Sequence, residues 1–90
     1  MATQIFASDF ASGYIGPGQT LGWWWEPDSW GQIPIFTVQA VAGAPTEKQV
    51  EVTRVFHITK SNGERQGNVF IKNTGSNGCF YLISWARVFN

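Results

Sequence analysis

The chain has 90 residues, of which 43% are hydrophobic, 16% aromatic and only 13% charged, and its formal net charge is zero. This length predicts one domain spanning residues 1–90, and the composition is too apolar for a disordered chain. The balanced charge argues against a nucleic-acid partner, and no apolar run is long enough to predict a membrane span. One cysteine, Cys79, and one histidine, His57, are too few for an internal disulfide or a zinc site.

The N-terminal residues lack the basic region and the continuous apolar run of a Sec signal peptide. Synthesis in the cytoplasm fits this pattern, with release by another route or trimming to a mature form as open alternatives. Charge is unevenly placed along the chain. Residues 1–47 hold four acids and no lysine or arginine, whereas residues 48–90 hold all six bases and two acids. Halves of opposite charge favour self-association if the folded molecule keeps them apart.

No window shows the apolar spacing of a helix, and the abundance of Val, Ile, Thr and aromatic residues is typical of strands. The first half predicts three strands, at residues 3–10, 19–26 and 33–42. Residues 11–18 contain three glycines and one proline, which predicts a turn-rich loop between the first two strands.

Residues 49–60 predict a fourth strand, with Val52 and Phe56 on the core face and His57 on the opposite face. Arg54 interrupts the core face. It either reaches past the edge of the core or marks a bulge that redirects the strand.

The dipeptide Asn62-Gly63 predicts a two-residue type I′ turn, in which both positions have positive φ. Residues 65–73 and 79–89 predict the last two strands, and the final three strands are expected to form a meander. The last strand is apolar on both faces, which predicts either a central place in its sheet or an outer face that meets a partner. The expected subunit contacts are Tyr81, Ile83, Trp85 and Phe89.

Six short strands separated by turns predict an all-β, single-domain antiparallel β-sandwich or a flattened barrel. In size and strand pattern the chain resembles small immunoglobulin-like or lectin-like sandwiches. This resemblance concerns architecture alone and implies no functional residue.

The chain offers little for catalysis. No nucleophile lies at a spacing that pairs it with His57, and no G-x-S-x-G elbow occurs. Gly13, Gly16 and Gly18 resemble a phosphate-binding loop only superficially, because neither a lysine nor a helix follows them. Cys79 is interpreted as a small apolar strand residue. We therefore predict a non-enzymatic protein with no cofactor and no bound metal.

Four of the five tryptophans fall within residues 23–30. Strand alternation places Trp23 and Trp25 on one face and Trp24 on the other, so at least one indole lies away from the main core unless a second layer covers it. Leaving a large side chain exposed forgoes roughly 1.5–3 kcal/mol of burial, so an exposed cluster usually has a use.

An aromatic ring beside carboxylates can bind a sugar, because the ring stacks on the C–H face while the carboxylates accept hydrogen bonds from hydroxyls. The predicted site uses Trp24 or Trp30 as the stacking ring, Glu26 and Asp28 as acceptors, and Tyr14 as a second wall. The leading hypothesis is a lectin-like carbohydrate-binding module. Its weak single sites would need self-association into a homo-oligomer to gain avidity.

The tryptophans and the neighbouring carboxylates are also compatible with different roles. A self-assembling subunit of a secreted particle, toxin complex or shell would bury the aromatics between copies. A small domain without disulfides also needs large core residues, so the tryptophans could be mostly core. The carboxylates of Glu26 and Asp28 would lie roughly 7 Å apart along an extended segment, which is compatible with glycoside hydrolysis. They could also hold calcium together with loop carbonyls.

Overall fold

The computed structural model describes residues 4–25, 33–41 and 46–89. These residues form six strands, which are β1 (Gln4–Ile15), β2 (Thr20–Trp25), β3 (Ile33–Ala40), β4 (Val50–Thr59), β5 (Arg65–Asn73) and β6 (Cys79–Phe89). The described part of the chain contains no helix, and so none long and apolar enough to cross a membrane.

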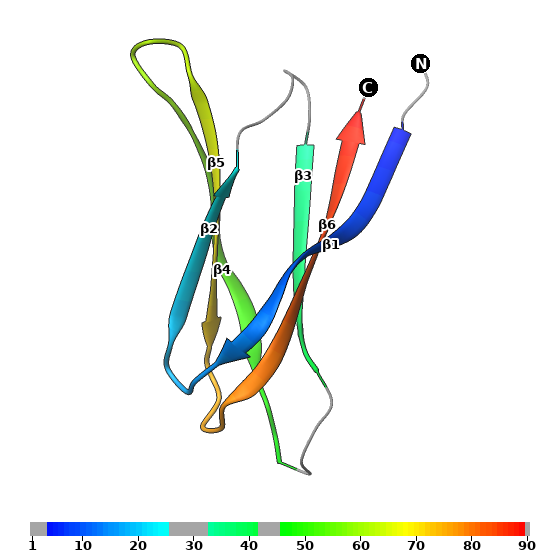
Figure 1. Ribbon diagram of the computed structural model, residues 1–90, viewed down its shortest axis with the longest axis vertical. Coiled ribbons are helices and arrows are strands. Elements are labelled where there is room, and N and C mark those ends of the chain that lie inside the picture. The colour runs from blue at the N-terminus through cyan, green and yellow to red at the C-terminus, as the bar shows by residue number, and fades with distance from the viewer. Residues whose placement is uncertain (1–3, 26–32, 42–45, 90) are drawn as a thin grey trace.

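The strands form two three-stranded antiparallel sheets, in the orders β1-β6-β3 and β2-β5-β4 (Figure 1). The chain changes sheet at every connection except the β4–β5 hairpin. The expected central position of β6 is confirmed, because it pairs with β1 on one side and β3 on the other. The expected meander is wrong, because residues 74–78 carry the chain across to the other sheet. The all-β arrangement is consistent with the predicted sandwich.

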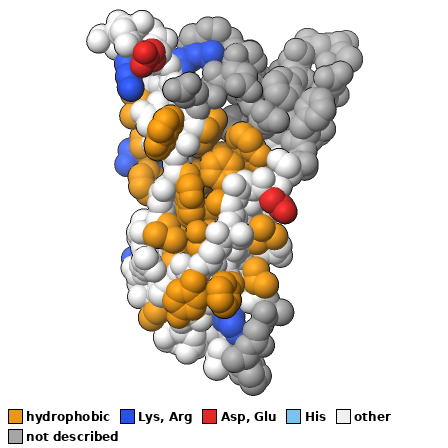
Figure 2. Space-filling view, viewed as in Figure 1, with side chains coloured by type: hydrophobic (Ala, Val, Ile, Leu, Met, Phe, Trp, Pro, Cys, Tyr) orange, Lys and Arg blue, Asp and Glu red, His pale blue; other side chains and the backbone are white. Residues whose placement is uncertain are grey.

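The buried core contains residues from strands of both sheets. Its most buried hydrophobic side chains are Ile15, Val69, Ile71, Cys79, Tyr81 and Ile83. Half-buried residues such as Trp23 and Val52 pack against this cluster, and the Trp23 ring lies 5.7 Å from that of Tyr81 in the opposite sheet. Figure 2 shows hydrophobic side chains along the middle of the molecule, in the space between the sheets of Figure 1. Cys79 is buried, as its interpretation as an apolar strand residue requires.

Strand β1 is longer than the sequence predicts, since it continues through Gly13 to Ile15. Gly13 pairs with Tyr81, and a Cβ at Gly13 would lie only 3.0 Å from the Tyr81 hydroxyl. This glycine therefore marks a close approach of a ring to the backbone rather than a turn. The turn itself begins at Gly16, whose carbonyl accepts a hydrogen bond from the Gln19 amide at 3.0 Å.

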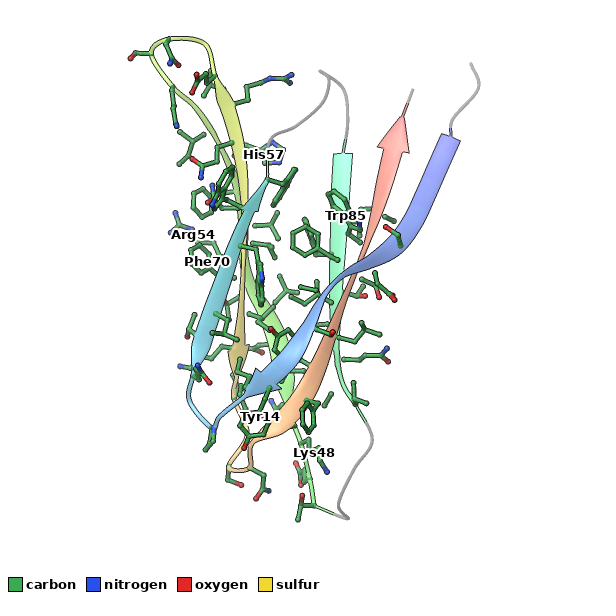
Figure 3. All side chains as sticks on the ribbon, in the orientation of Figure 1. Tyr14, Lys48, Arg54, His57, Phe70 and Trp85 are labelled. Carbon is green, nitrogen blue, oxygen red and sulfur yellow. The ribbon has the colours of Figure 1, made fainter. Side chains whose placement is uncertain are left out.

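A bulge interrupts β4 beside Arg54, so the second alternative, in which Arg54 marks a bulge that redirects the strand, is confirmed. The register with β5 shifts between Val52 and Arg54, and the extra residue, Thr53, donates its hydroxyl to the Phe70 carbonyl at 3.3 Å. One inserted residue exchanges the two faces of a strand. Arg54 and Phe56 therefore lie on the outer face, while His57 pairs with the buried Gly67 on the inner side. The predicted faces of Phe56 and His57 are thus wrong, and Figure 3 shows Arg54 and His57 pointing in opposite directions.

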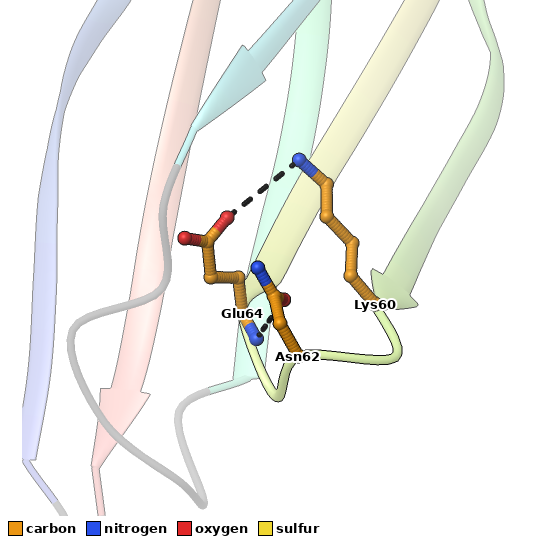
Figure 4. A network of polar contacts seen from close by, with 3 residues as sticks. All are labelled: Lys60, Asn62 and Glu64. Atoms are coloured by element: carbon orange, nitrogen blue, oxygen red, sulfur yellow. Dashed lines mark hydrogen bonds and ion pairs between the residues drawn. The ribbon is translucent and has the colours of Figure 1, made fainter.

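The β4–β5 hairpin is not the predicted type I′ turn, because no described non-glycine residue has positive φ. Gly63 has φ 88°, its amide donates to the Lys60 carbonyl at 2.9 Å, and the Lys60 amide donates to the Glu64 carbonyl at 2.8 Å. This is a three-residue loop with glycine in the left-handed position. The Asn62 side-chain oxygen accepts a hydrogen bond from the Glu64 amide at 3.0 Å (Figure 4). The Lys60 ammonium forms an ion pair with the Glu64 carboxylate at 3.8 Å. Both charges are exposed, so the ion pair adds little stability.

A second group of rings extends the apolar interior beyond the buried cluster. Phe10, Trp25, Phe36 and Trp85 come from four different strands, and their ring centroids lie 5.0–6.3 Å apart. The Trp85 indole donates to the Ser8 hydroxyl at 2.9 Å, and the His57 ring meets Trp25 edge-on at 5.6 Å. Such edge-to-face contacts stabilise rings beyond their burial alone.

These positions correct the subunit contact expected on β6. Tyr81 and Ile83 belong to the core, and Trp85 packs among the inner rings, so these side chains face the second sheet. The side chain of Phe89 lies outside the described part of the structure. The physical reason is that β6 is the central strand of its sheet, so its inward-facing large residues are needed to fill the core.

The buried phenol of Tyr81 predicts a stability change at alkaline pH. Burial raises the pKa of Tyr81 above its ordinary value of 10.0, because the interior disfavours the phenolate. The folded state thus holds this proton more tightly than the unfolded state. The resulting stability is present below about pH 10 and is lost as the pH rises through the folded pKa. We expect thermal unfolding midpoints from pH 8 to 11 to fall more steeply for the wild type than for Tyr81→Phe; parallel curves would contradict this.

Candidate functional site

The burial pattern of β2 alternates along the strand, so that Leu21, Trp23 and Trp25 are half-buried and Trp24 is exposed. Trp24 has 61% of its surface exposed on the outer face of the β2-β5-β4 sheet. The expectation that at least one indole lies away from the core is therefore confirmed. The reason is purely local, because successive strand residues point to opposite faces.

On this outer face, Trp24 belongs to one row of residues paired across the three strands, and a second row lies next to it. Trp24 lies opposite Asn68 on β5, which in turn lies opposite Phe56 on β4. The next row consists of Gly22, Phe70 and Arg54. We call the five side chains of these two rows the Trp24 patch, which comprises Trp24, Arg54, Phe56, Asn68 and Phe70.

The absence of a side chain at Gly22 shapes the patch. A Cβ there would lie 2.6 Å from Cδ1 of the Phe70 ring, so this ring lies over the glycine. Phe70 also stacks parallel to Phe56, with 6.0 Å between centroids and 5° between planes. The Arg54 guanidinium lies 4.1 Å from the Phe56 centroid, a cation–π contact that holds its charge at this surface.

Asn68 is a residue of this site that the sequence reasoning missed. Its amide nitrogen is buried and has no hydrogen-bond partner among the described residues. An unsatisfied buried donor costs about 1–3 kcal/mol, so it is uncommon in a protein interior. Asparagine is also depleted in strands, which is the one sequence signal that could have drawn attention to this position.

Tyr14 lies on the outer face of the other sheet, where its ring meets Phe80 edge-on at 5.5 Å. Tyr14 therefore does not form the second wall of a site at Trp24, as expected from the sequence, because β1 and β2 belong to different sheets. The other predicted site residues, Trp30, Glu26 and Asp28, lie outside the described residues.

The polar groups of the Trp24 patch are the Arg54 guanidinium, which only donates hydrogen bonds, and the Asn68 amide, which has a donor nitrogen and an acceptor oxygen. Arg54 is the only charge of the patch, is exposed, and forms no ion pair within the described ranges. Glu51 and Lys72 lie opposite each other in the β4–β5 register. They form the row beyond that of Gly22, Phe70 and Arg54, two rows away from Trp24. Among the described side chains, no three His, Cys, Asp or Glu residues gather in a way that could hold a metal ion.

Comparisons with models of protein families, with curated proteins and with solved structures each find no match. What this surface can bind is therefore inferred from its own residues. The surface combines an exposed indole, a flat pair of stacked phenyl rings, a guanidinium and an amide donor that has no partner among the described residues. Such a surface can bind a ligand that has an apolar face and oxygen acceptors.

Proposed function

We propose that this protein is a non-enzymatic, lectin-like carbohydrate-binding module that uses the Trp24 patch, on a domain whose two sheets pack as a β-sandwich. The observation that carries the proposal is Trp24, a large apolar side chain with 61% exposure on a regular strand. A strand holds the ring in a fixed direction, so little ordering is needed when a ligand binds.

The contacts divide between stacking and hydrogen bonding. The indole of Trp24 takes the C–H face of a pyranose, and the guanidinium of Arg54 donates to its hydroxyl or ring oxygens. Rotation of Asn68 would turn its amide nitrogen toward the sugar, and this atom gives up no hydrogen bond to a described residue in doing so. Glu26 and Asp28, which follow Trp25 in the sequence, remain the proposed acceptors for sugar hydroxyls.

The experiment is a glycan array probed with labelled protein at low and high concentration. We expect a saturable signal on a related set of sugars. Trp24→Ala should weaken it by about 2 kcal/mol, or roughly thirtyfold, because a central ring carries much of the binding energy of a small site. The matched control is Ile58→Ala, which truncates another exposed apolar residue on the same outer face, outside the patch.

Two results would contradict the proposal. A sugar signal that Trp24→Ala leaves unchanged would show that the site lies elsewhere. A blank array at both concentrations would favour the structural alternative, in which the protein is a self-assembling subunit. The exposure of Tyr14, Ile35 and Phe80 on the other sheet favours that second candidate. A stable large oligomer whose tryptophans are protected from acrylamide quenching would support it.

A further inference from the structure

The outer face of the β1-β6-β3 sheet carries a row of exposed apolar side chains at one end. Tyr14 and Phe80 are paired across β1 and β6 and are 58% and 62% exposed. Val41, 41% exposed, continues the row, since its amide donates to the Phe80 carbonyl at 2.9 Å. Ile35, 51% exposed, lies on the same face six residues from Val41, which is about 20 Å along an extended strand.

This face is also nearly free of charge. Asp9 is the only charged residue among the described side chains that alternation places on it, and the others are apolar or are serine, threonine or glutamine. The outer face of β2-β5-β4, in contrast, carries Glu51, Arg54 and Lys72 along its strands. Depletion of charge with exposed aromatic residues is the composition of the centre of a protein–protein interface.

We propose that a second copy of this chain packs on the outer face of the β1-β6-β3 sheet. Apart from Asp9, which lies on the edge strand β1, the described side chains of this face carry no charge that selects an oppositely charged partner, and the face is compatible with itself under a two-fold axis. With the strands of the two copies antiparallel, the row of Tyr14, Phe80 and Val41 lies over the end of the partner that holds Ile35. The more polar middle of each face, which includes Gln39, then lies near the axis.

The size of the face sets the strength of the dimer. Three strands spaced about 4.8 Å apart and eight residues long present a flat area of roughly 400 Å². A stable interface of standard size buries about 800 Å² on each partner. The dimer is therefore weak and dissociates on dilution.

This arrangement relocates the subunit contact that the sequence suggested. The same strand, β6, supplies it through Phe80 and Leu82 rather than through the inward-facing Tyr81 and Ile83. Packing back to back also leaves the β2-β5-β4 face of each copy free. The two Trp24 patches of a dimer then point in opposite directions, which would let it bridge two glycans. Only this last consequence rests on the proposed function.

The test is sedimentation velocity of the purified protein over a concentration series up to several hundred micromolar. The wild type should shift from monomer to dimer. Phe80→Lys should raise the dimer dissociation constant roughly tenfold or more, because each copy would bury an unpaired lysine against the apolar end of the partner. Gln39→Lys adds a charge to the same face without removing an apolar side chain, and should weaken the dimer even if Phe80→Lys folds poorly.

The matched control is Ile58→Lys, which places the same charge on the outer face of the other sheet. It should dimerise like the wild type. A wild type that stays monomeric throughout, or a dimer unaffected by both Phe80→Lys and Gln39→Lys, would overturn the proposal. These outcomes leave the glycan proposal untouched, because binding of a monovalent sugar to the Trp24 patch does not need the dimer.

Discussion

Asn73→Leu is expected to lower the free energy of unfolding by about 3 kcal/mol, the largest loss we predict for a single polar side chain. Asn73 is fully buried at the end of β5, and its amide nitrogen donates to the carbonyls of Ile15 at 3.1 Å and Asn77 at 2.8 Å. Its side-chain oxygen accepts from the Gly75 amide at 2.9 Å. One side chain thus joins the end of β1 to the loop that crosses between the sheets.

The expected loss follows from what the leucine leaves behind. A side chain of similar size removes these three hydrogen bonds, so the carbonyls of Ile15 and Asn77 and the amide of Gly75 lose the Asn73 side chain as a partner. For a domain of this length, 1 kcal/mol corresponds to roughly 4–8 °C in melting temperature, so the midpoint should fall by well over 10 °C. Thermal and urea unfolding followed by circular dichroism measure both quantities.

Two further asparagine variants control this prediction. Asn73→Asp keeps the acceptor for Gly75 but turns a carboxylate oxygen toward two carbonyls, so it should destabilise at least as much. Asn62→Ala removes an exposed hydrogen bond in the β4–β5 hairpin and should cost less than about 1 kcal/mol. An Asn73→Leu protein as stable as the wild type would mean that the Asn73 contacts do not hold the sheets together.

The second large effect is expected from Gly67→Ala, which should cost about 2 kcal/mol by overpacking. Gly67 is buried opposite Trp25, and an added Cβ would lie 2.8 Å from Cδ2 of the Trp25 ring. The ring has little room to withdraw, because it also touches Phe36, Trp85 and His57. The expected signs are a lower urea midpoint and a changed near-ultraviolet circular dichroism signal from the displaced indole.

Gly16→Ala provides the matched comparison. A Cβ at Gly16 would come nearest to the side-chain oxygen of Gln19, at 3.6 Å, which is an ordinary contact. This change should leave stability nearly unaltered, or raise it by a few tenths of a kcal/mol by restricting the unfolded chain. If Gly67→Ala and Gly16→Ala had the same stability, the close approach of Trp25 to the β5 backbone would not be a constraint on the fold.

Local pattern was enough to predict several elements of this protein. The bounds of β5 and β6 agree with those predicted, because turn-forming residues flank both strands and alternation runs through them. The same alternation correctly separated Trp24 from Trp23 and Trp25. Each of these features depends on residues that are close together in the chain.

Other features depend on which strand lies beside which, and this only the tertiary structure decided. The pairing of β6 with β1 and β3 joins residues up to 85 positions apart, as in Gln4 with Phe89, and no local signal specifies it. The bulge at Thr53 then reversed the faces of Phe56 and His57 and so assembled the Trp24 patch. Gly13 looks like a turn residue in the sequence, yet it is the place where Tyr81 meets the backbone. Gly67, inside a predicted strand, provides the same close approach for Trp25.

The sequence by itself therefore determined that this chain is an all-β protein with an outward-facing tryptophan, because strand alternation and turn chemistry act over a few residues. The tertiary structure decided that Trp24 and Tyr14 belong to different sheets, and that Tyr81 and Ile83 belong to the core. It also brought Asn68 and Arg54 to the side of Trp24. The physical reason is that a surface formed across three strands depends on their pairing register, which is set by the packing of the whole domain.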